Sequence, residues 1–154
     1  MVVHLRVSVS AQRLDLIGDD GHVTRSFSVS TAKKGTGSEP DSKKTPLGWH
    51  RICEKIGDGA APGTQFVGRR PNGRVWRPTD PVEGKNLVLT RILWLDGEEP
   101  HNRTSKDRYI YIHGTNREDL IGTPASAGCV CLKNSDVIDL YSLVPVGTRV
   151  EIIP

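Results

Sequence analysis

Two stretches decide the fold of this chain: Tyr109-Ile110-Tyr111-Ile112-His113-Gly114-Thr115 and Ser126-Ala127-Gly128-Cys129-Val130-Cys131. In the first, apolar and aromatic residues alternate as in a β-strand, and the strand gives way where His113 meets Gly114. In the second, Gly128 permits a tight turn that can aim several backbone N–H groups at one point. A thiol needs a base to become a thiolate, and an acyl intermediate needs donors for its oxyanion. Together the two stretches indicate a reactive cysteine with its base.

The composition predicts one domain over residues 1–154, because this length is enough for a core but short for two domains. Only 36% of the residues are hydrophobic, and 16 Gly with 10 Pro indicate many turns, as in a strand-rich fold. The net charge of +3 is spread along the chain, which argues against a nucleic-acid partner. We expect no membrane span, because no run approaches about 18 apolar residues.

The cysteines and the start of the chain bear on its compartment. Three cysteines, at positions 53, 129 and 131, form no disulfide framework. The chain begins directly in an alternating strand pattern, without the features of an export signal. We therefore expect a cytoplasmic protein if residue 1 is the native start, and otherwise a periplasmic or cell-envelope one.

The sequence pattern predicts a mostly-β domain with one helix. Expected strands cover residues 3–9, 23–30, 47–56, 86–95 and 147–153. Residues 57–84 form a Gly/Pro-rich connection in this interpretation, and residues 96–107 form a flexible lid beside the histidine strand. The helix follows Cys131, with Asn134 or Ser135 as its cap and Pro145 as its stop.

His113-Gly114-Thr115 followed by Ser126-Ala127-Gly128-Cys129 resembles the L,D-transpeptidase catalytic domain, or YkuD domain. The elements Lys44-Thr45-Pro46-Leu47-Gly48 and Gly147-Thr148-Arg149-Val150 are similar to that family as well, so the resemblance covers essentially the whole chain. It implies a β-sandwich or closed barrel of mixed sheets, with one helix after the cysteine.

The resemblance also implies a reaction. Substrates would be peptidoglycan tetrapeptide stems or muropeptides, attacked between the L-centre of a diamino acid and the terminal D-Ala. Cys129 would be the nucleophile, His113 the base, and the Gly114 carbonyl would orient the imidazole. Backbone N–H groups of Ala127, Gly128 and Cys129 would form the oxyanion hole. No cofactor or metal is implied, and carbapenem-type β-lactams would be covalent inhibitors.

One position departs from the family pattern. Most relatives have Arg or Asn two residues after the catalytic cysteine, and Cys131 stands there in this chain. A thiol cannot make the bidentate carboxylate contact of an Arg. We expect Arg103, Arg108 or Arg117 to substitute for it, and Ser126, Tyr111 and Cys131 to line the substrate pocket.

Several alternatives remain at this level. The missing export signal favours water as acyl acceptor, hence L,D-carboxypeptidase activity on recycled muropeptides. An amine acceptor would instead give L,D-transpeptidation in the cell wall. A non-catalytic peptidoglycan-binding module is the alternative of another class. Zinc ligation by Cys129, Cys131 and His113 is disfavoured, because Cys-x-Cys is a poor structural-zinc spacing.

Overall fold

A computed structural model describes residues 2–82 and 84–154 of the chain. It contains ten strands, one α-helix and two short 3-10 helices. In chain order the strands are β1 (Val2–Ser8), β2 (Arg13–Gly18), β3 (Val23–Ser28), β4 (Gly48–Ile56), β5 (Thr64–Val67), β6 (Arg70–Val75), β7 (Leu89–Gly97), β8 (Tyr111–Gly114), β9 (Val130–Leu132) and β10 (Arg149–Ile153). The helices are α1 (Asn134–Leu143), η1 (Pro100–Asn102) and η2 (Glu118–Leu120).

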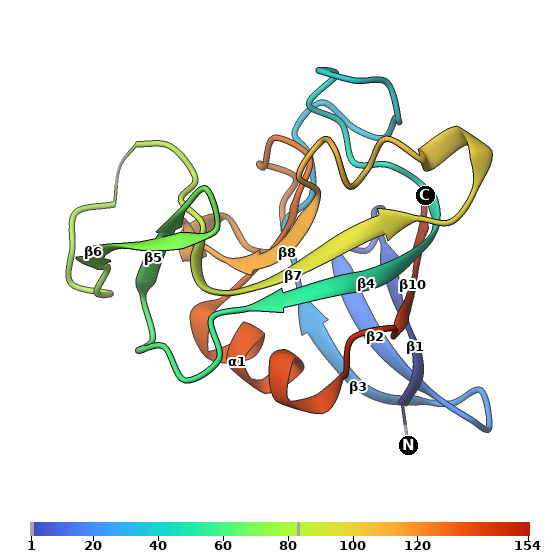
Figure 1. Ribbon diagram of the computed structural model, residues 1–154, viewed down its shortest axis with the longest axis horizontal. Helices are drawn as coiled ribbons and strands as arrows, with labels where there is room; N and C mark the ends of the chain where they lie inside the picture. The colour runs from blue at the N-terminus through green and yellow to red at the C-terminus, as the bar shows by residue number, and fades with distance from the viewer. Residues whose placement is uncertain (1, 83) are drawn as a thin grey trace.

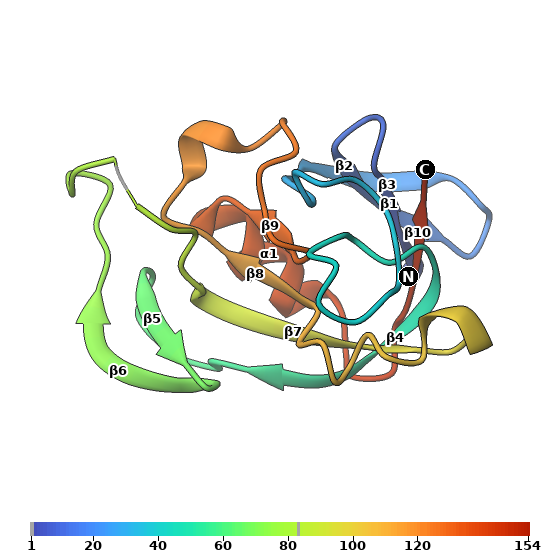
Figure 2. The same cartoon turned by 90° about the horizontal axis from the view of Figure 1, so that it is seen from above.

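The strands form one mixed sheet rather than separate sheets (Figure 1). Its order is β3-β2-β1-β10-β4-β7-β5-β6, and β8 and β9 branch from β7. Two pairs are parallel, β1 with β10 and β8 with β9, and the other pairs are antiparallel. Figure 2 shows β8 and β9 in the middle of the molecule, between β7 and the β1–β3 end of the sheet. The expected mostly-β fold with one helix after the cysteine is confirmed.

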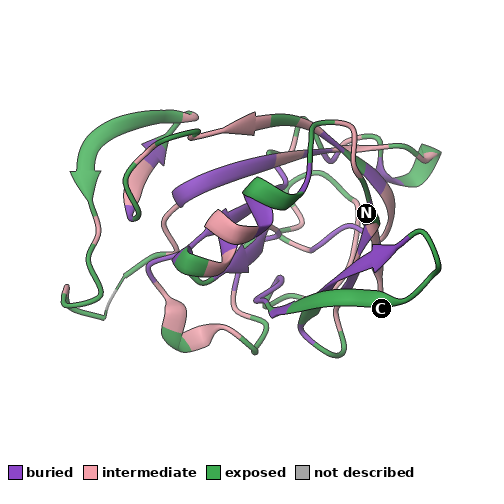
Figure 3. Cartoon of the chain, turned by 90° about the horizontal axis from the view of Figure 1, so that it is seen from below, coloured by how far each residue is buried: buried purple, intermediate pink, exposed green. Residues whose placement is uncertain are grey.

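The main core is formed by α1 together with strands β1–β4 and β7–β10. Fully buried side chains from β1, β4, β7, β8 and α1 meet in it, because alternate residues of each strand point inward. Burial in α1 is one-sided, as Figure 3 shows. Among the described residues, no helix is long and apolar enough to cross a membrane.

The β5–β6 hairpin is the element that the sequence interpretation missed. Residues 57–84 were expected to be a connection without strands, yet β5 and β6 pair with each other and β5 also contacts β7. Every residue of β6 is exposed, so its sequence carries no alternation of apolar and polar positions. Gly68 and Arg69 form the two-residue turn, both with positive φ.

The start of α1 also differs from the expectation. Neither Asn134 nor Ser135 caps the helix; Lys133 is the N-cap residue and makes no side-chain cap. Glu118 accepts a hydrogen bond from the Asn134 N–H at 2.8 Å and so caps the helix from outside. Asn134 instead uses its side chain to bond the Thr115 carbonyl at 2.9 Å. These contacts join α1 to the end of β8.

The segment between β7 and β8 is anchored, in contrast to the flexible lid expected from its polar sequence. Asn102 and Ser105 are fully buried. The Asn102 amide donates to the carbonyls of Leu47 and Trp49, at 3.1 and 3.0 Å. The imidazole of His50 bonds the Ser105 hydroxyl at 2.9 Å. Because the anchoring groups are polar, the composition of this segment is the same as that of a free loop.

His50 makes this anchor sensitive to acid. Burial lowers its pKa below the ordinary value of 6.5. Below pH 6.5, His50 is therefore protonated more readily in the unfolded chain than in the folded chain. Its contribution to the free energy of unfolding is complete above pH 6.5 and is lost as the pH falls below that value. We expect urea unfolding to show a steeper loss of stability between about pH 6.5 and 5 for the wild type than for His50→Gln. Equal slopes for the two proteins would contradict this role of His50.

Candidate active site

The parallel pairing of β8 with β9 builds the site. Ile112 lies opposite Val130 and His113 lies opposite Cys131. Paired residues of parallel strands point to the same face, and side chains alternate along each strand. One face therefore sends Ile112, Val130 and Leu132 into the core. The other face carries Tyr111 and His113 from β8, with Cys129 and Cys131 beside them.

The His113 imidazole is held in one tautomer. Its Nδ1 lies 2.6 Å from the Gly114 carbonyl oxygen, which only accepts, so Nδ1 carries the proton and Nε2 is the basic nitrogen. This is the contact that the expected orienting role of the Gly114 carbonyl requires. Gly114 has to be glycine, because a Cβ there would lie 2.5 Å from the Asn134 Oδ1 and 2.8 Å from the Leu89 carbonyl oxygen.

The thiol in direct contact with His113 is that of Cys131, and no contact between His113 and the Cys129 thiol occurs among the described residues. His113 Nε2 lies 3.6 Å from the Cys131 Sγ. The reason is the register, since position 131 is directly opposite position 113, whereas Cys129 precedes the first residue of β9. The Asn86 amide donates to the same sulfur at 3.0 Å. Cys131 is 1% exposed, and burial raises its pKa to about 12.

Cys129 occupies a more open position on the same face. Its side chain is half-buried and packs beside Tyr111. The Sγ lies 3.4 Å from the Tyr111 N–H nitrogen and 3.4 Å from the Tyr109 carbonyl oxygen. Tyr109 directly follows the 96–108 segment, so this segment ends next to the Cys129 thiol.

The turn before Cys129 is fixed from two sides. Ser126 is buried; its hydroxyl donates to the Cys129 carbonyl at 2.6 Å and accepts from the Gly128 N–H at 3.2 Å. Gly128 has φ +125°, a conformation that side chains disfavour. Thr45 donates to the Gly128 carbonyl at 3.0 Å and so fixes the turn from its other side.

This geometry narrows the expected oxyanion hole. The Gly128 N–H already donates to the Ser126 hydroxyl, which leaves Ala127 and Cys129 as the other expected donors. The N–H groups of Ala127 and Cys129 donate to no acceptor among the described residues. Two unused donors beside a thiol suit a developing oxyanion.

Two of the three arginines that were expected to substitute at position 131 are committed elsewhere. Arg108 bonds the Lys44 carbonyl at 2.6 Å and the Ser42 hydroxyl at 3.3 Å, and so holds the 37–44 loop beside Cys129. Arg117 forms a two-point pair with Asp119 at 3.1 and 3.0 Å. Arg103 is exposed.

Arg69 is the basic residue that sequence reasoning missed at this site. Its guanidinium lies 4.6 Å from the Trp94 ring centroid. It also donates to the Tyr111 hydroxyl at 3.2 Å. Nothing local in the sequence marks this position, because the β5–β6 hairpin brings it to the site.

Two open depressions flank the Ala127 turn. One is lined by Lys43, Thr104, Arg108, Tyr109 and Ala127 among others. Four lysines line the other, together with Asn86 and Ala125–Ala127: Lys33, Lys34, Lys43 and Lys85. No group of three His, Cys, Asp or Glu side chains in the described part of the chain could hold a metal ion.

The comparison with protein families agrees with this geometry. The model of the YkuD family, the L,D-transpeptidase catalytic domain, matches residues 3–152. The chain belongs to this family.

Named relatives share the assignment. The probable L,D-transpeptidase ErfK/SrfK of Escherichia coli strain K12 is 52% identical over 153 residues, covering 96% of this chain and 43% of the relative. Its Salmonella typhimurium counterpart is 39% identical over 93 residues, covering 56% of this chain and 30% of the relative. The matched region thus spans less than half the length of these relatives.

Solved structures share the fold. The L,D-transpeptidase from Xylanimonas cellulosilytica has a TM-score of 0.62 at 18% identity, covering 97% of this chain and 59% of its own. L,D-transpeptidase 3 from Mycobacterium tuberculosis, solved with a faropenem-derived adduct, has a TM-score of 0.61 at 17% identity, covering 99% and 60%. At this identity the likeness establishes the fold alone.

The buried thiol of Cys131 leads to a test at alkaline pH. Its pKa is raised from 9.0 to about 12, so above pH 9 the unfolded chain loses a proton that the folded chain keeps. Stability is therefore full below pH 9 and falls as the pH rises toward 12. By urea unfolding under reducing conditions, we expect the wild type to lose about 2 kcal/mol more than Cys131→Ala between pH 7 and about pH 10.5. An equal loss in both proteins would contradict the buried neutral thiol.

Proposed function

We propose that this domain transfers the acyl group of peptidoglycan tetrapeptide stems through a thioester on Cys129, with release of the terminal D-Ala. One observation carries the proposal. The half-exposed Cys129 thiol lies next to two unused backbone N–H groups, on the same strand face as an imidazole whose basic nitrogen points to that face. These are the groups that thiol acyl transfer requires.

Cys129 is the better nucleophile of the two thiols, although Cys131 is nearer to His113. With a pKa of about 12, only about one Cys131 side chain in 10⁵ is a thiolate at pH 7. Cys131 is also almost fully buried, so a stem carbonyl could not approach its sulfur. The contact of Cys131 with His113 makes it a positioning residue for the base.

The reaction proceeds in two halves. The Cys129 thiol gives its proton to His113 Nε2 once the two side chains come together, since active-site contacts commonly close only when substrate is bound. The thiolate attacks the carbonyl of the diamino acid, and the oxyanion is held by the N–H groups of Ala127 and Cys129. The C–N bond then breaks, and His113 returns the proton to the amine of the departing D-Ala. A thioester remains on Cys129.

For the second half we propose water as the main acceptor, which makes the domain an L,D-carboxypeptidase. The depression lined by four lysines supports this choice, because none of them has an acidic partner among the described residues. An amine acceptor approaches as an ammonium ion, and like charges repel it. A water molecule has no net charge and is not repelled.

L,D-transpeptidation is the second candidate, in which an amine of another stem or of a free D-amino acid takes the acyl group. The relatives favour it, since ErfK/SrfK of Escherichia coli carries the name of a probable L,D-transpeptidase. The same site serves both reactions. By the same acylation, carbapenem-type β-lactams would bind covalently to Cys129.

Turnover of a purified disaccharide-tetrapeptide tests the proposal. We expect Cys129→Ala and His113→Ala each to lower D-Ala release at least about 10³-fold, because each removes thiolate attack. Cys53→Ser is the matched thiol control, since Cys53 donates to the Trp94 carbonyl at 3.4 Å and a serine keeps that donor. This control should retain turnover.

Product analysis by mass spectrometry separates the acceptors. Water gives tripeptide and D-Ala in equal amounts, with few dimers even when stems are concentrated. If dimers dominate the products, or if added D-amino acid is exchanged into the stem, the main reaction is transpeptidation and not hydrolysis. Normal D-Ala release by Cys129→Ala would overturn the cysteine mechanism altogether, and no turnover by the wild type would favour a non-catalytic binding module.

A further inference from the structure

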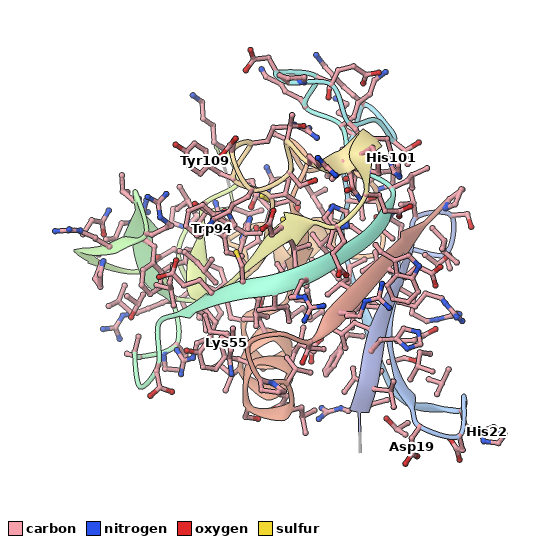
Figure 4. The ribbon with its side chains drawn as sticks, turned by 45° about the vertical axis from the view of Figure 1, so that its right-hand side comes forward. Asp19, His22, Lys55, Trp94, His101 and Tyr109 are labelled. Carbon is pink, nitrogen blue, oxygen red and sulfur yellow. The ribbon has the colours of Figure 1, made fainter. Side chains whose placement is uncertain are left out.

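Arg69 and three aromatic rings form a cluster next to Cys129 that comes from three separate parts of the chain. Trp94 lies on β7, Tyr111 begins β8 with Tyr109 two residues before it, and Arg69 lies in the β5–β6 turn. The rings of Trp94 and Tyr109 are 6.1 Å apart, and Figure 4 shows these two residues close together. Arg69 lies over both rings, at 4.6 and 5.4 Å. We call this group the Arg69 cluster.

Two members of the cluster have an unfavourable backbone conformation. Arg69 has φ +66° and Tyr109 has φ +58°, in the left-handed region that large side chains disfavour. The second position of such a hairpin turn normally prefers glycine. Strain of this kind is retained where the surrounding structure fixes it, and it concentrates at functional sites. Here it brings a guanidinium and a phenol ring together beside the thiol.

Arg69 retains unused binding capacity. A guanidinium has five N–H donors in a planar fork that matches a carboxylate. Only Nη1 has a hydrogen-bond partner among the described residues, the Tyr111 hydroxyl. No carboxylate of the described chain lies within ion-pair distance of it. By contrast, Arg108 and Arg117 already have their acceptors.

The position of Arg69 relative to Cys129 indicates which group of a substrate at the thiol lies within reach of the guanidinium. The backbone N–H of Tyr111 contacts the Cys129 Sγ, while the hydroxyl of the same residue contacts Arg69. The guanidinium is thus one tyrosine side chain away from the sulfur. In a diaminopimelate residue, three methylene groups separate the reacting L-centre from a second centre with its own carboxylate. The length of this side chain is comparable to that of the tyrosine side chain that separates the sulfur from the guanidinium.

We propose that Arg69 binds the distal carboxylate of the diamino acid in the acyl donor, and that the domain therefore selects a stem residue with a free second carboxylate. The proposal rests on the function proposed above. It places the arginine contact that Cys131 cannot make on a different element of the fold. Trp94 and Tyr109 hold the guanidinium in place by stacking, which leaves its fork directed to the ligand.

The test uses three tetrapeptides that differ at the third residue: diaminopimelate with a free distal carboxylate, the same residue amidated there, and lysine. We expect the wild type to favour the free carboxylate over the amide about tenfold in kcat/KM. Arg69→Met keeps much of the stacking and removes the charge, so its ratio should fall to about one. Arg70→Gln is the matched control, because Arg70 is the exposed neighbour in the same hairpin, and it should keep the ratio.

Binding to inactive protein makes the result independent of turnover. In a Cys129→Ala background, calorimetry of the same three peptides should show the same preference, lost with Arg69→Met and partly kept with Arg69→Lys. Equal affinity for acid and amide, or a preference that survives Arg69→Met, would overturn the proposal. A preference that depends on Arg69 in a protein that releases no D-Ala would support the binding role and reject the proposed reaction.

Discussion

The in-register parallel pairing of β8 with β9 is the constraint on which the rest of the site depends. Two strands of four and three residues determine which side chains enter the core and which face the substrate. Gly114 lets α1 approach β8, and Glu118 and Asn134 fasten the helix start to the end of that strand. A shift of one residue would exchange the two faces, so that His113 would point into the core and Ile112 toward the substrate.

That pairing gives two cysteines of one strand different environments. Cys131 lies opposite His113, buried, neutral and bonded by Asn86. Cys129 lies at the open end of the same face, next to the free N–H groups of the turn. Nearness to the base and access to the substrate thus belong to different thiols. In the proposed reaction the accessible thiol carries the chemistry, and the buried thiol positions the base.

The sequence was sufficient for the parts of this structure that are local. Alternation predicted most strands, and the composition around Gly128 predicted the turn that precedes Cys129. The direct thiol partner of His113 was not predictable, because it depends on strand register. Arg69 was missed for a related reason, since an exposed hairpin far away in the chain brings it to Trp94. The anchored 96–108 segment was misjudged because buried polar residues such as Asn102 have the composition of a loop.

The most direct test of the central claim is to locate the adduct that a carbapenem forms with the wild-type protein. Intact mass gives the number of adducts, and fragmentation of the peptide that contains both thiols places the added mass before or after Val130. The account predicts a single adduct on Cys129, still formed by Cys131→Ala and absent from Cys129→Ala. An adduct on Cys131, or one that persists in Cys129→Ala, would contradict it.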